Sequence, residues 1–359
     1  MSSAETVTIV VPTYNRADLL GTCLDSLVAQ DHEALEILVV DDGSTDATPE
    51  LLAGYLVEHP GRVRAVRQDN AGQSAALNHG FALAQGAILG TLSSDDVLYP
   101  DGVSKVVAPM LADPAVDLSF PDCHTMDAEG VVLDRLTFGP FDVVASIRDH
   151  NCPIGVGPLF RRALIERLGG WDAGYRYCPD LEFWFRLGLG GVRTAYVPEP
   201  LGAWRVHDEG LSATRSIDVA HERLRIVEDL FKRDDLPPDV LAVRGAACRN
   251  ALIIAGLIAT PEETAHQRFS VIDALPRKLV ASATDEVAEH LAALKLALVE
   301  TQQDTAVAVA AAEALHADVE ALHREVSLRD AEIVRLHAEV ATRDAEIDRL
   351  ERAPTLSQQ

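Results

Sequence analysis

Hydrophobic and polar positions follow two alternating periods along the first 120 residues. Short runs rich in Val, Ile and Leu are typical of buried strands, and they alternate with stretches in which hydrophobic residues recur every three or four positions, as in a helix packed on one face. This pattern predicts, in order, a strand at Val7–Val11, a helix at Asp18–Gln30, a strand at Leu35–Val40, a helix capped by Thr45 or Asp46 with Pro49 in its first turn, a strand at Arg62–Arg67, a helix at Gln73–Ala84 and a strand at Ala87–Leu92.

Strand–helix alternation of this kind predicts βαβ units, and therefore an α/β fold with a parallel sheet covered on both faces. Ligands of such sheets bind at the carboxyl ends of the strands. That rule directs attention to Pro12–Arg16, Asp41–Asp46 and Ser93–Asp96 before any motif is considered.

The pattern changes after Leu118. Up to about Leu211 it mixes short strands, loops rich in Gly and Pro, and two helices at Phe160–Leu168 and Asp180–Leu187. Residues 216–283 read as helical with interruptions at prolines, and they show no spacing typical of catalytic residues. We therefore expect a first domain at 1–215 and a helical connector at 216–283.

Residues 284–353 contain a heptad repeat that is continuous from Leu315. β-Branched residues occupy one seam position, and Leu or Arg the other, which favours a parallel two-stranded coiled coil. The alternative is a long solvated helix packed on its own domain. The coiled coil predicts a homodimer, or docking on another heptad protein, and residues 354–359 are expected to be a disordered tail.

The charge composition of the chain restricts the kinds of molecule that it can bind. The 359 residues include 31 basic and 56 acidic side chains, a formal net charge of −25. Nucleic-acid binding needs a surplus of Lys and Arg on one face, so we expect no nucleic-acid partner. Charge alone would not hold the protein on an anionic membrane either.

The chain also gives few signs of export or of metal binding by cysteine. Its longest apolar run, Ala251–Ala259, is too short to span a bilayer, and its first residues do not resemble a secretory signal. Five scattered cysteines without a CxxC pair argue against a zinc site or a redox pair. We expect a cytoplasmic protein without a transmembrane segment, and a peripheral position at the inner membrane face stays open.

Two acidic pairs stand at predicted strand ends. Asp95 and Asp96 follow a strongly apolar strand and would repel each other unless a cation lies between them, as Mg²⁺ or Mn²⁺ does when it also binds a diphosphate. Asp41 and Asp42 can accept hydrogen bonds from a nucleobase N–H or a ribose hydroxyl. A turn and helix cap is the alternative for Asp41 and Asp42, and helix initiation before Pro100 is the alternative for Asp95 and Asp96.

The segment VTIVVPTYNRADLLGTCLDSLVAQ, followed by EILVVDDGSTDAT, resembles the opening of family 2 glycosyltransferases, which have the Rossmann-like GT-A fold. The resemblance covers about residues 6–215, with several motifs in the same order. It implies that Pro12, Thr13, Tyr14 and Asp42 contact the nucleoside. It also implies that Asp95–Asp96 is the metal motif of the family, with Asp96 on the metal and Asp95 on the ribose or the metal.

The loop and helix at Asp69–Gly86 are expected to reach the donor as well. Gly72 lets the backbone approach a ligand, and Ser74, Asn78 and the helix N-terminus can meet phosphate or ribose oxygens. Leu77 stands where many relatives carry Arg. The alternative is a capped amphipathic helix.

Asp180 matches the position of the family's catalytic base. It opens a predicted helix, whose dipole should lower the pKa of the carboxyl group and keep it ionised. A base at this place deprotonates the acceptor hydroxyl as it attacks the anomeric carbon. Glu182 and Asp172 are weaker candidates, and helix capping alone is the alternative for Asp180.

Further residues are expected around the sugars and the diphosphate. Gly155 and Gly157 allow close backbone approach, and Trp171 and Trp184 either form walls for sugar rings or belong to the core. The resemblance implies that Arg205 and His207 reach back to the diphosphate and the metal, because Arg offers forked donors to phosphate and imidazole is an acceptable ligand.

The resemblance thus implies an inverting glycosyltransferase that moves one sugar from a nucleotide-diphosphate sugar to a hydroxyl of a glycan or glycoconjugate, assisted by Mn²⁺ or Mg²⁺. The QxxRW motif of processive polymerases is absent, which favours transfer of a single sugar. One alternative is a catalytically degenerate nucleotide-sugar-binding scaffold presented by the coiled coil. A nucleotidyltransferase is disfavoured because the first loop supplies only Arg16 for a triphosphate.

Overall fold

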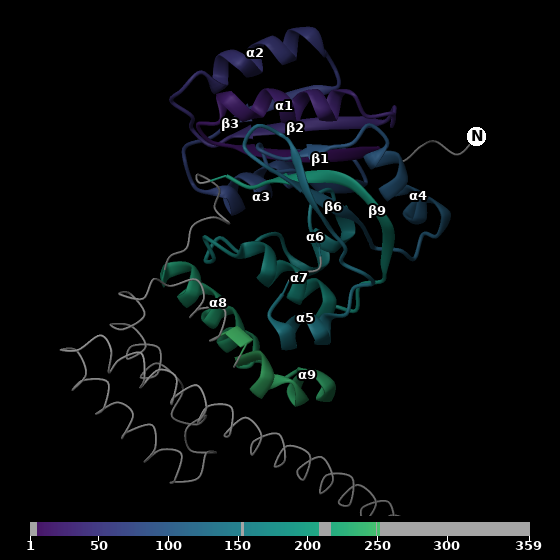
Figure 1. Cartoon of the computed structure of the whole chain (residues 1–359), viewed down its shortest axis with the longest axis vertical. Coiled ribbons are helices and arrows are strands. Elements are labelled where there is room, and N and C mark those ends of the chain that lie inside the picture. The colour runs from purple at the N-terminus through teal and green to yellow at the C-terminus, as the bar shows by residue number, and fades with distance from the viewer. Residues whose placement is uncertain (1–5, 152–153, 208–216, 249, 252–359) are drawn as a thin grey trace, which may run out of the picture. The chain divides into compact units, whose positions relative to one another are not determined.

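The computed structural model of the chain describes residues 6–151, 154–207, 217–248 and 250–251 (Figure 1). A single mixed sheet of nine strands organises this part of the molecule. The strands are β1 (Val7–Thr13), β2 (Leu35–Asp41), β3 (Val63–Arg67), β4 (Ile88–Thr91), β5 (Val97–Leu98), β6 (Leu118–Met126), β7 (Val132–Leu136), β8 (Leu159–Arg161) and β9 (Thr194–Arg205).

The strand order is β3-β2-β1-β4-β8-β6-β9-β5, with β7 paired to β6. The first four strands are parallel, as the sequence predicts, and each begins and ends within two residues of its predicted bounds. Beyond β4 the sheet becomes mixed, because β8 runs antiparallel to both β4 and β6. The α/β prediction is therefore confirmed, while the purely parallel sheet holds only for the N-terminal half.

The helices of this part of the chain include two that the hydrophobic pattern does not predict, α4 and α5. They are α1 (Ala17–Val28), α2 (Thr48–Glu58), α3 (Gln73–Leu83), α4 (Gly102–Ala112), α5 (Val143–Asp149), α6 (Arg162–Leu168), α7 (Pro179–Leu189), α8 (Ile217–Leu230) and α9 (Pro238–Ala242). The predicted cap of α2 is wrong, since the N-cap residue is Ala47. Asp46 precedes it and accepts a hydrogen bond from the Thr48 amide at 3.0 Å.

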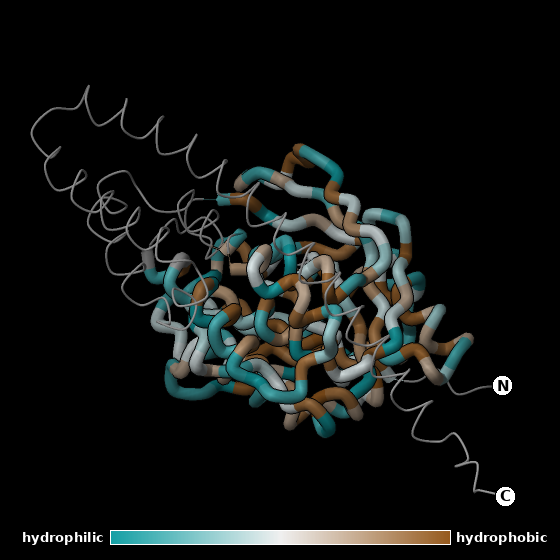
Figure 2. The backbone as a smooth tube through the Cα atoms, turned by 90° about the horizontal axis from the view of Figure 1, so that it is seen from below, coloured by the Kyte–Doolittle hydropathy of each residue, from teal (hydrophilic) through white to brown (hydrophobic). Residues whose placement is uncertain are grey.

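Alternate residues of the central strands enter two separate cores, which is why the strands read as continuous hydrophobic runs. Ile9 and its odd-numbered neighbours on β1 pack under α1 and α4. Val10 faces the opposite side with Leu77 and Phe81 of α3. Gly80 lets α3 approach closely, because a Cβ atom there would lie 2.3 Å from Val10 Cγ1. In Figure 2 the brown hydrophobic segments run through the interior of the described chain.

A third core joins α5 and α7 to α8 and α9. Ile147, Phe185, Ile226, Val227 and Val240 are buried together in it. The domain boundary expected at residue 215 stays a prediction, and helix α8, which follows it, packs on α5 and α7 in this core. Helix α8 belongs to the same body as the sheet, a placement that matters for the site.

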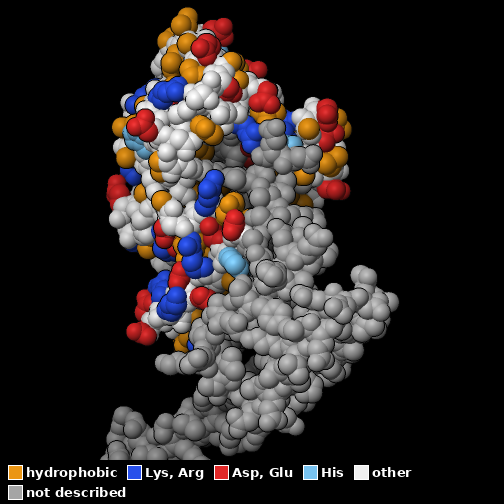
Figure 3. Space-filling view, turned by 90° about the vertical axis from the view of Figure 1, so that its left-hand side faces the viewer, with side chains coloured by type: hydrophobic (Ala, Val, Ile, Leu, Met, Phe, Trp, Pro, Cys, Tyr) orange, Lys and Arg blue, Asp and Glu red, His pale blue; other side chains and the backbone are white. Residues whose placement is uncertain are grey.

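The coiled coil expected at 284–353 and the tail at 354–359 lie outside the described residues. Within the described part, no helix is both long and apolar enough to cross a membrane. Cys23, Cys123 and Cys178 are buried and form no disulfide bond. On the face shown in Figure 3, acidic and basic side chains are interspersed and do not form a basic patch.

Candidate functional site

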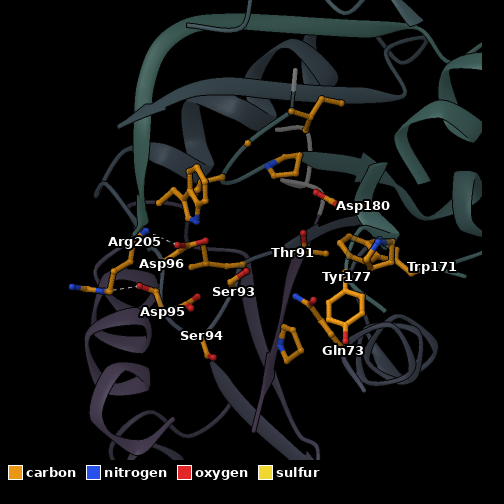
Figure 4. Close-up of a pocket in the computed structure, with 18 of the residues that line it drawn as sticks. Gln73, Thr91, Ser93, Ser94, Asp95, Asp96, Trp171, Tyr177, Asp180 and Arg205 are labelled. Carbon is orange, nitrogen blue, oxygen red and sulfur yellow. Dashed lines mark hydrogen bonds between the residues drawn. The ribbon is translucent and has the colours of Figure 1, made fainter. Parts of the chain in front are cut away.

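The carboxyl ends of β1, β2 and β4 open on a cavity of about 1060 Å³, as the βαβ rule predicts. It extends from the strand ends to the N-terminus of α7 (Figure 4). Of the residues expected at the site, the following line it: Pro12, Thr13, Tyr14, Asp42, Asp95, Asp96, Asp180, Arg205 and His207. Asp41 and Asn78 are not among the lining residues.

Asp42 organises the loop between β3 and α3. Its carboxylate accepts hydrogen bonds from the amides of Ala71 and Gly72 and from Gln68 Nε2, at 2.8–2.9 Å. Gly72 has a φ of +88°, a conformation that residues with a side chain rarely adopt. The carboxylate of Asp42 thus shapes the cavity wall beside Tyr14, whose side chain is 46% exposed and available for stacking.

Asp41 is turned away from the cavity. Its Oδ1 accepts a hydrogen bond from the Ser44 amide at 2.8 Å, and its Oδ2 pairs with Arg67 at 3.0 Å. The carboxylate therefore holds the turn after β2, which is the alternative that the sequence left open. The two acids of this pair have different surroundings because successive side chains of a strand point to opposite faces.

Asp95 and Asp96 form the acidic end of the cavity, together with Ser93 (Figure 4). Asp96 is only 6% exposed. Burial raises the pKa of Asp96 well above its usual value, and the neighbouring charge of Asp95 adds to the rise. The backbone amide of Arg205 donates to Asp96 Oδ1 at 2.9 Å and partly opposes it.

Arg205 and His207, at and just beyond the end of β9, both contact this acidic pair. Arg205 Nε donates to the carbonyl of Asp95 at 2.9 Å, and Nη1 donates to the carbonyls of Asp127 and Ala128. These bonds join the loop after β4 to the segment after β6 through the side chain of Arg205. His207 Nε2 lies 3.1 Å from Asp95 Oδ2, so His207 contacts Asp95. The carboxylate of Asp96 accepts its hydrogen bond from the backbone amide of Arg205.

The chemistry of this donor set fits a divalent cation. The charge of Arg205 opposes only part of the rise in the pKa of Asp96 that burial and Asp95 cause, and oxygen ligands such as these two carboxylates are what Mg²⁺ and Mn²⁺ prefer. Among the described residues, no three His, Cys, Asp or Glu side chains are grouped to hold a metal by themselves. A cation here would take ligands from Asp95 or Asp96 and its remaining ligands from phosphate and water.

Asp180 lies at the other end of the cavity, at the second residue of α7, with Trp171 and Tyr177 nearby (Figure 4). Cys178, not Asp180, is the N-cap residue. The sequence predicts a lowered pKa for Asp180, and this prediction is wrong. Burial raises the pKa of Asp180, although backbone hydrogen bonding and the charge of Arg223 oppose the rise. Desolvation outweighs the helix dipole, and a raised pKa suits a general base.

The weaker candidates for the base are occupied elsewhere. Glu182 pairs with Arg186 at 2.7 Å one turn along α7. Asp172 accepts a hydrogen bond from the Gly174 amide at 2.7 Å. Neither lines the cavity.

Glu222 of α8 fixes the segment that leads into α7. Its carboxylate accepts hydrogen bonds from the amides of Arg176, Tyr177 and Cys178, at 2.6–2.7 Å, and the residue is only 8% exposed. Three charge-assisted bonds from one buried group determine where Asp180 stands. A helix that the sequence assigns to a connector therefore supports the candidate base.

Asn78 supports the same region from α3. Its amide donates to the carbonyl of Trp171 at 2.7 Å and accepts from the Trp171 amide at 2.8 Å. The side chain of Asn78 thus makes two bonds within the protein, and its contact with the donor stays a prediction. Trp171 and Trp184 are both buried and both line the cavity, so each belongs to the hydrophobic core and also forms part of the cavity wall.

The two expected glycines also serve the packing. A Cβ atom at Gly155 would lie 2.7 Å from the Phe138 ring, and one at Gly157 would lie 2.8 Å from Leu98 Cδ2. Gly155 lines the cavity and Gly157 does not, so only the first of the two small residues brings the cavity wall close to the core.

Sequence reasoning missed three residues that line the cavity, His150, Arg176 and Arg223. His150 follows α5 in a left-handed conformation, with φ of 52°. Arg176 stands four residues before Asp180, and this closeness in sequence is a signal that could have identified it. Arg223 lies in the segment that the sequence assigns to a helical connector without catalytic spacing, and only the packing of α8 reveals its position.

Comparison with known proteins identifies the domain. Residues 8–169 match the family model described as Glycosyl transferase family 2. An uncharacterized glycosyltransferase of Nostoc sp. is 35% identical over 210 residues, which cover 56% of this chain and 65% of that protein. The uncharacterized glycosyltransferase YibD of Escherichia coli is 36% identical over 124 residues, covering 34% of this chain and 35% of YibD. The chain thus spans less than two thirds of the length of either relative.

Among solved structures, a mannosyltransferase of Pyrobaculum calidifontis in complex with GDP-Man and Mn²⁺ superposes with a TM-score of 0.54. It is 24% identical, and the match covers 82% of this chain and 87% of that one. At this identity the likeness concerns the fold. Residues 8–169 are therefore a glycosyltransferase family 2 domain, set in an α/β fold of the GT-A type.

Proposed function

We propose that the protein transfers a single sugar from a nucleotide-diphosphate sugar to a hydroxyl group of a glycan or glycoconjugate, with inversion at the anomeric carbon. The observation that carries this proposal is one cavity with a buried acidic pair at one end and a carboxyl group of raised pKa at the other. The family 2 match and the GDP-Man complex of the Pyrobaculum neighbour support the donor class.

The donor lies across the strand ends in this proposal. Tyr14 and Pro12 contact the base, while Thr13, whose buried Oγ1 has no partner in the protein, bonds a ribose or phosphate oxygen. The diphosphate points to Asp95 and Asp96. Asp96 and the Asp95–His207 pair would hold a divalent cation, Mn²⁺ or Mg²⁺, which would supply Lewis-acid stabilisation of the leaving group. Arg205 keeps the Asp95 loop in place through its carbonyl bonds.

Asp180 accepts the proton of the acceptor hydroxyl as its oxygen attacks the anomeric carbon. The carbon–oxygen bond to the diphosphate breaks, and its electron pair leaves with the diphosphate. One displacement at one carbon inverts its configuration. Because burial raises the pKa of Asp180, its carboxylate is a stronger base than an exposed aspartate would be.

A donor screen tests the proposal. UDP-, GDP- and dTDP-sugars are incubated with the protein, Mn²⁺ and candidate acceptors, and released nucleotide is measured. Consumption of one donor supports transfer. Nucleotide binding without consumption of any donor would instead favour the scaffold that the sequence left as an alternative.

Assembly and location are separate proposals. We propose a cytoplasmic homodimer joined through residues 284–353, supported by the heptad pattern alone. Sedimentation of the full chain beside a chain ending near residue 284 tests this. Equal association states for the two would remove the heptad segment as the dimer contact.

A further inference from the structure

The end of the cavity around Asp180 contains buried hydrogen-bonding groups that the protein leaves unpaired. Among the described residues, eight buried side-chain polar atoms lack a partner. Four of them, Trp171 Nε1, Arg223 Nη1 and both ring nitrogens of His150, belong to residues that line this end. Native proteins rarely leave such groups unsatisfied, and at a binding site they indicate where a ligand completes the bonds.

The unpaired groups are mainly donors. Trp Nε1 and Arg Nη1 can only donate hydrogen bonds. His150 is fully buried, and burial together with the charge of Arg223 lowers its pKa to about 3, so its ring is neutral and donates from one nitrogen. A ligand that satisfies these groups must offer several acceptor atoms close together.

The balance of charge at this end favours an anion. Arg176 and Arg223 line the cavity, and the charge of Arg223 acts on the carboxyl group of Asp180. Asp180 becomes neutral when it accepts the proton of the acceptor, which removes one negative charge from the surroundings of Arg223. The neighbouring Glu222 has its oxygens bonded to three backbone amides and fixes α8 against the segment before Asp180.

We propose that this cluster, defined as Trp171, His150 and Arg223, binds an oxyanion on the acceptor, a carboxylate or a phosphate. The inference rests on the proposed function, because it places the acceptor beside Asp180. Arg223 contributes the charge, and Trp171 Nε1 and His150 contribute further donors. The substrate class is thus an acidic acceptor, such as a uronic acid or a sugar phosphate.

Calorimetry on the full chain tests the proposal. The protein is saturated with Mn²⁺ and with the nucleoside diphosphate that binds it among UDP, GDP and dTDP. Methyl β-D-glucuronide, D-glucose 6-phosphate and the neutral methyl β-D-glucoside are then titrated. We expect at least one charged probe to bind about tenfold more tightly than the neutral one, as a charge-assisted hydrogen bond predicts.

The variant Arg223→Gln should remove the preference for the charged probes and keep nucleotide binding. Arg233→Gln is the matched control, because Arg233 follows α8, pairs with Asp235 at the surface and does not line the cavity. Equal or undetectable binding of all three probes overturns the proposal, as does a preference that survives in Arg223→Gln.

Further results would overturn parts of the proposal separately. Loss of the preference in Arg233→Gln as well would assign it to overall charge and overturn the proposal. A donor screen in which UDP-glucuronate is preferred over neutral donors, with that preference lost in Arg223→Gln, would place the oxyanion on the donor and overturn the assignment to the acceptor. Failure of every nucleotide to bind would overturn the proposed function, while the three probes titrated without nucleotide still report on Arg223.

Discussion

The two ends of the cavity satisfy their polar groups in different ways. At the acidic end, Arg205 bonds three carbonyl groups and its amide bonds Asp96, so most donors are used within the protein. At the Asp180 end, Trp171, His150 and Arg223 keep buried donors without partners. The acidic end has too much negative charge and the Asp180 end has spare donors, so each end calls for a different ligand group.

The two ends also differ in origin. The donor side combines the ends of strands β1, β2 and β4 with Arg205 of β9, which bonds Asp95 across 110 positions of the chain. The Asp180 end is assembled from α3, α7 and α8, whose contacts join residues 93 positions apart in the case of Asn78 and Trp171. We expect substitutions at the Asp180 end to affect transfer without affecting nucleotide binding, and those at the acidic end to affect both.

The largest expected effect separates chemistry from binding. Asp180→Asn keeps the shape of the side chain and removes the base, so transfer should fall by about 10²–10⁴-fold. Released nucleotide measures the rate, and calorimetry with the nucleoside diphosphate measures binding, which should be unchanged. Unaltered turnover would remove Asp180 from the role of base.

The next effect concerns the acidic end. Asp96→Asn should lower metal-dependent transfer by about 10²-fold and weaken nucleotide binding, because the cation loses a ligand. Without metal, the same variant should have a higher Tm at neutral pH than the parent protein. The control is Asp101→Asn, at an exposed carboxylate that pairs with Lys105 at the surface.

The sign of the Asp96 effect follows from its raised pKa. Below the ordinary pKa of 3.8, Asp96 is protonated in both the folded and the unfolded state, so its burial lowers the stability of the protein only a little. As the pH rises above that value, the unfolded state loses the proton first and native stability declines until the raised pKa is passed. The Tm difference between Asp96→Asn and the parent, measured with a chelator, should therefore grow from acidic to neutral pH; a constant difference would contradict it.

A smaller effect is expected where α8 positions Asp180. Glu222→Ala removes the acceptor of three backbone amides and should reduce transfer by about 10–100-fold through displacement of Asp180. Nucleotide affinity should stay the same, and Tm should fall. Glu228→Ala on the same helix is the control, and an equal loss of transfer in it would deny Glu222 a specific positioning role.

The smallest effect distinguishes the two interpretations of Asn78. Asn78→Ala removes two hydrogen bonds to Trp171, which should cost about 1–3 kcal/mol in the free energy of unfolding. Urea denaturation measures this cost. A contact with the donor would instead weaken nucleotide binding while leaving stability unchanged, so the two readouts decide between them.

The sequence determined the local elements and the residue types at the strand ends. Hydrophobic periodicity places β1 to β4 and α1 to α3 because burial on two faces of a sheet leaves a continuous apolar run, visible without any tertiary contact. The motifs at Pro12–Tyr14, Asp42 and Asp95–Asp96 follow from the same rule that strand ends meet at one edge.

Only the tertiary structure decided which polar groups are free to act. Asp41 and Asp42 are adjacent in sequence, yet one supports a turn and the other lines the cavity. The pKa of Asp180 rises because burial outweighs the helix dipole, and burial depends on segments far along the chain. Glu222 and Arg223 look like ordinary surface charges in the sequence. They become the support of Asp180 and an unpaired buried donor because α8 packs against α7, and such packing is set by long-range hydrophobic contacts that local periodicity does not encode.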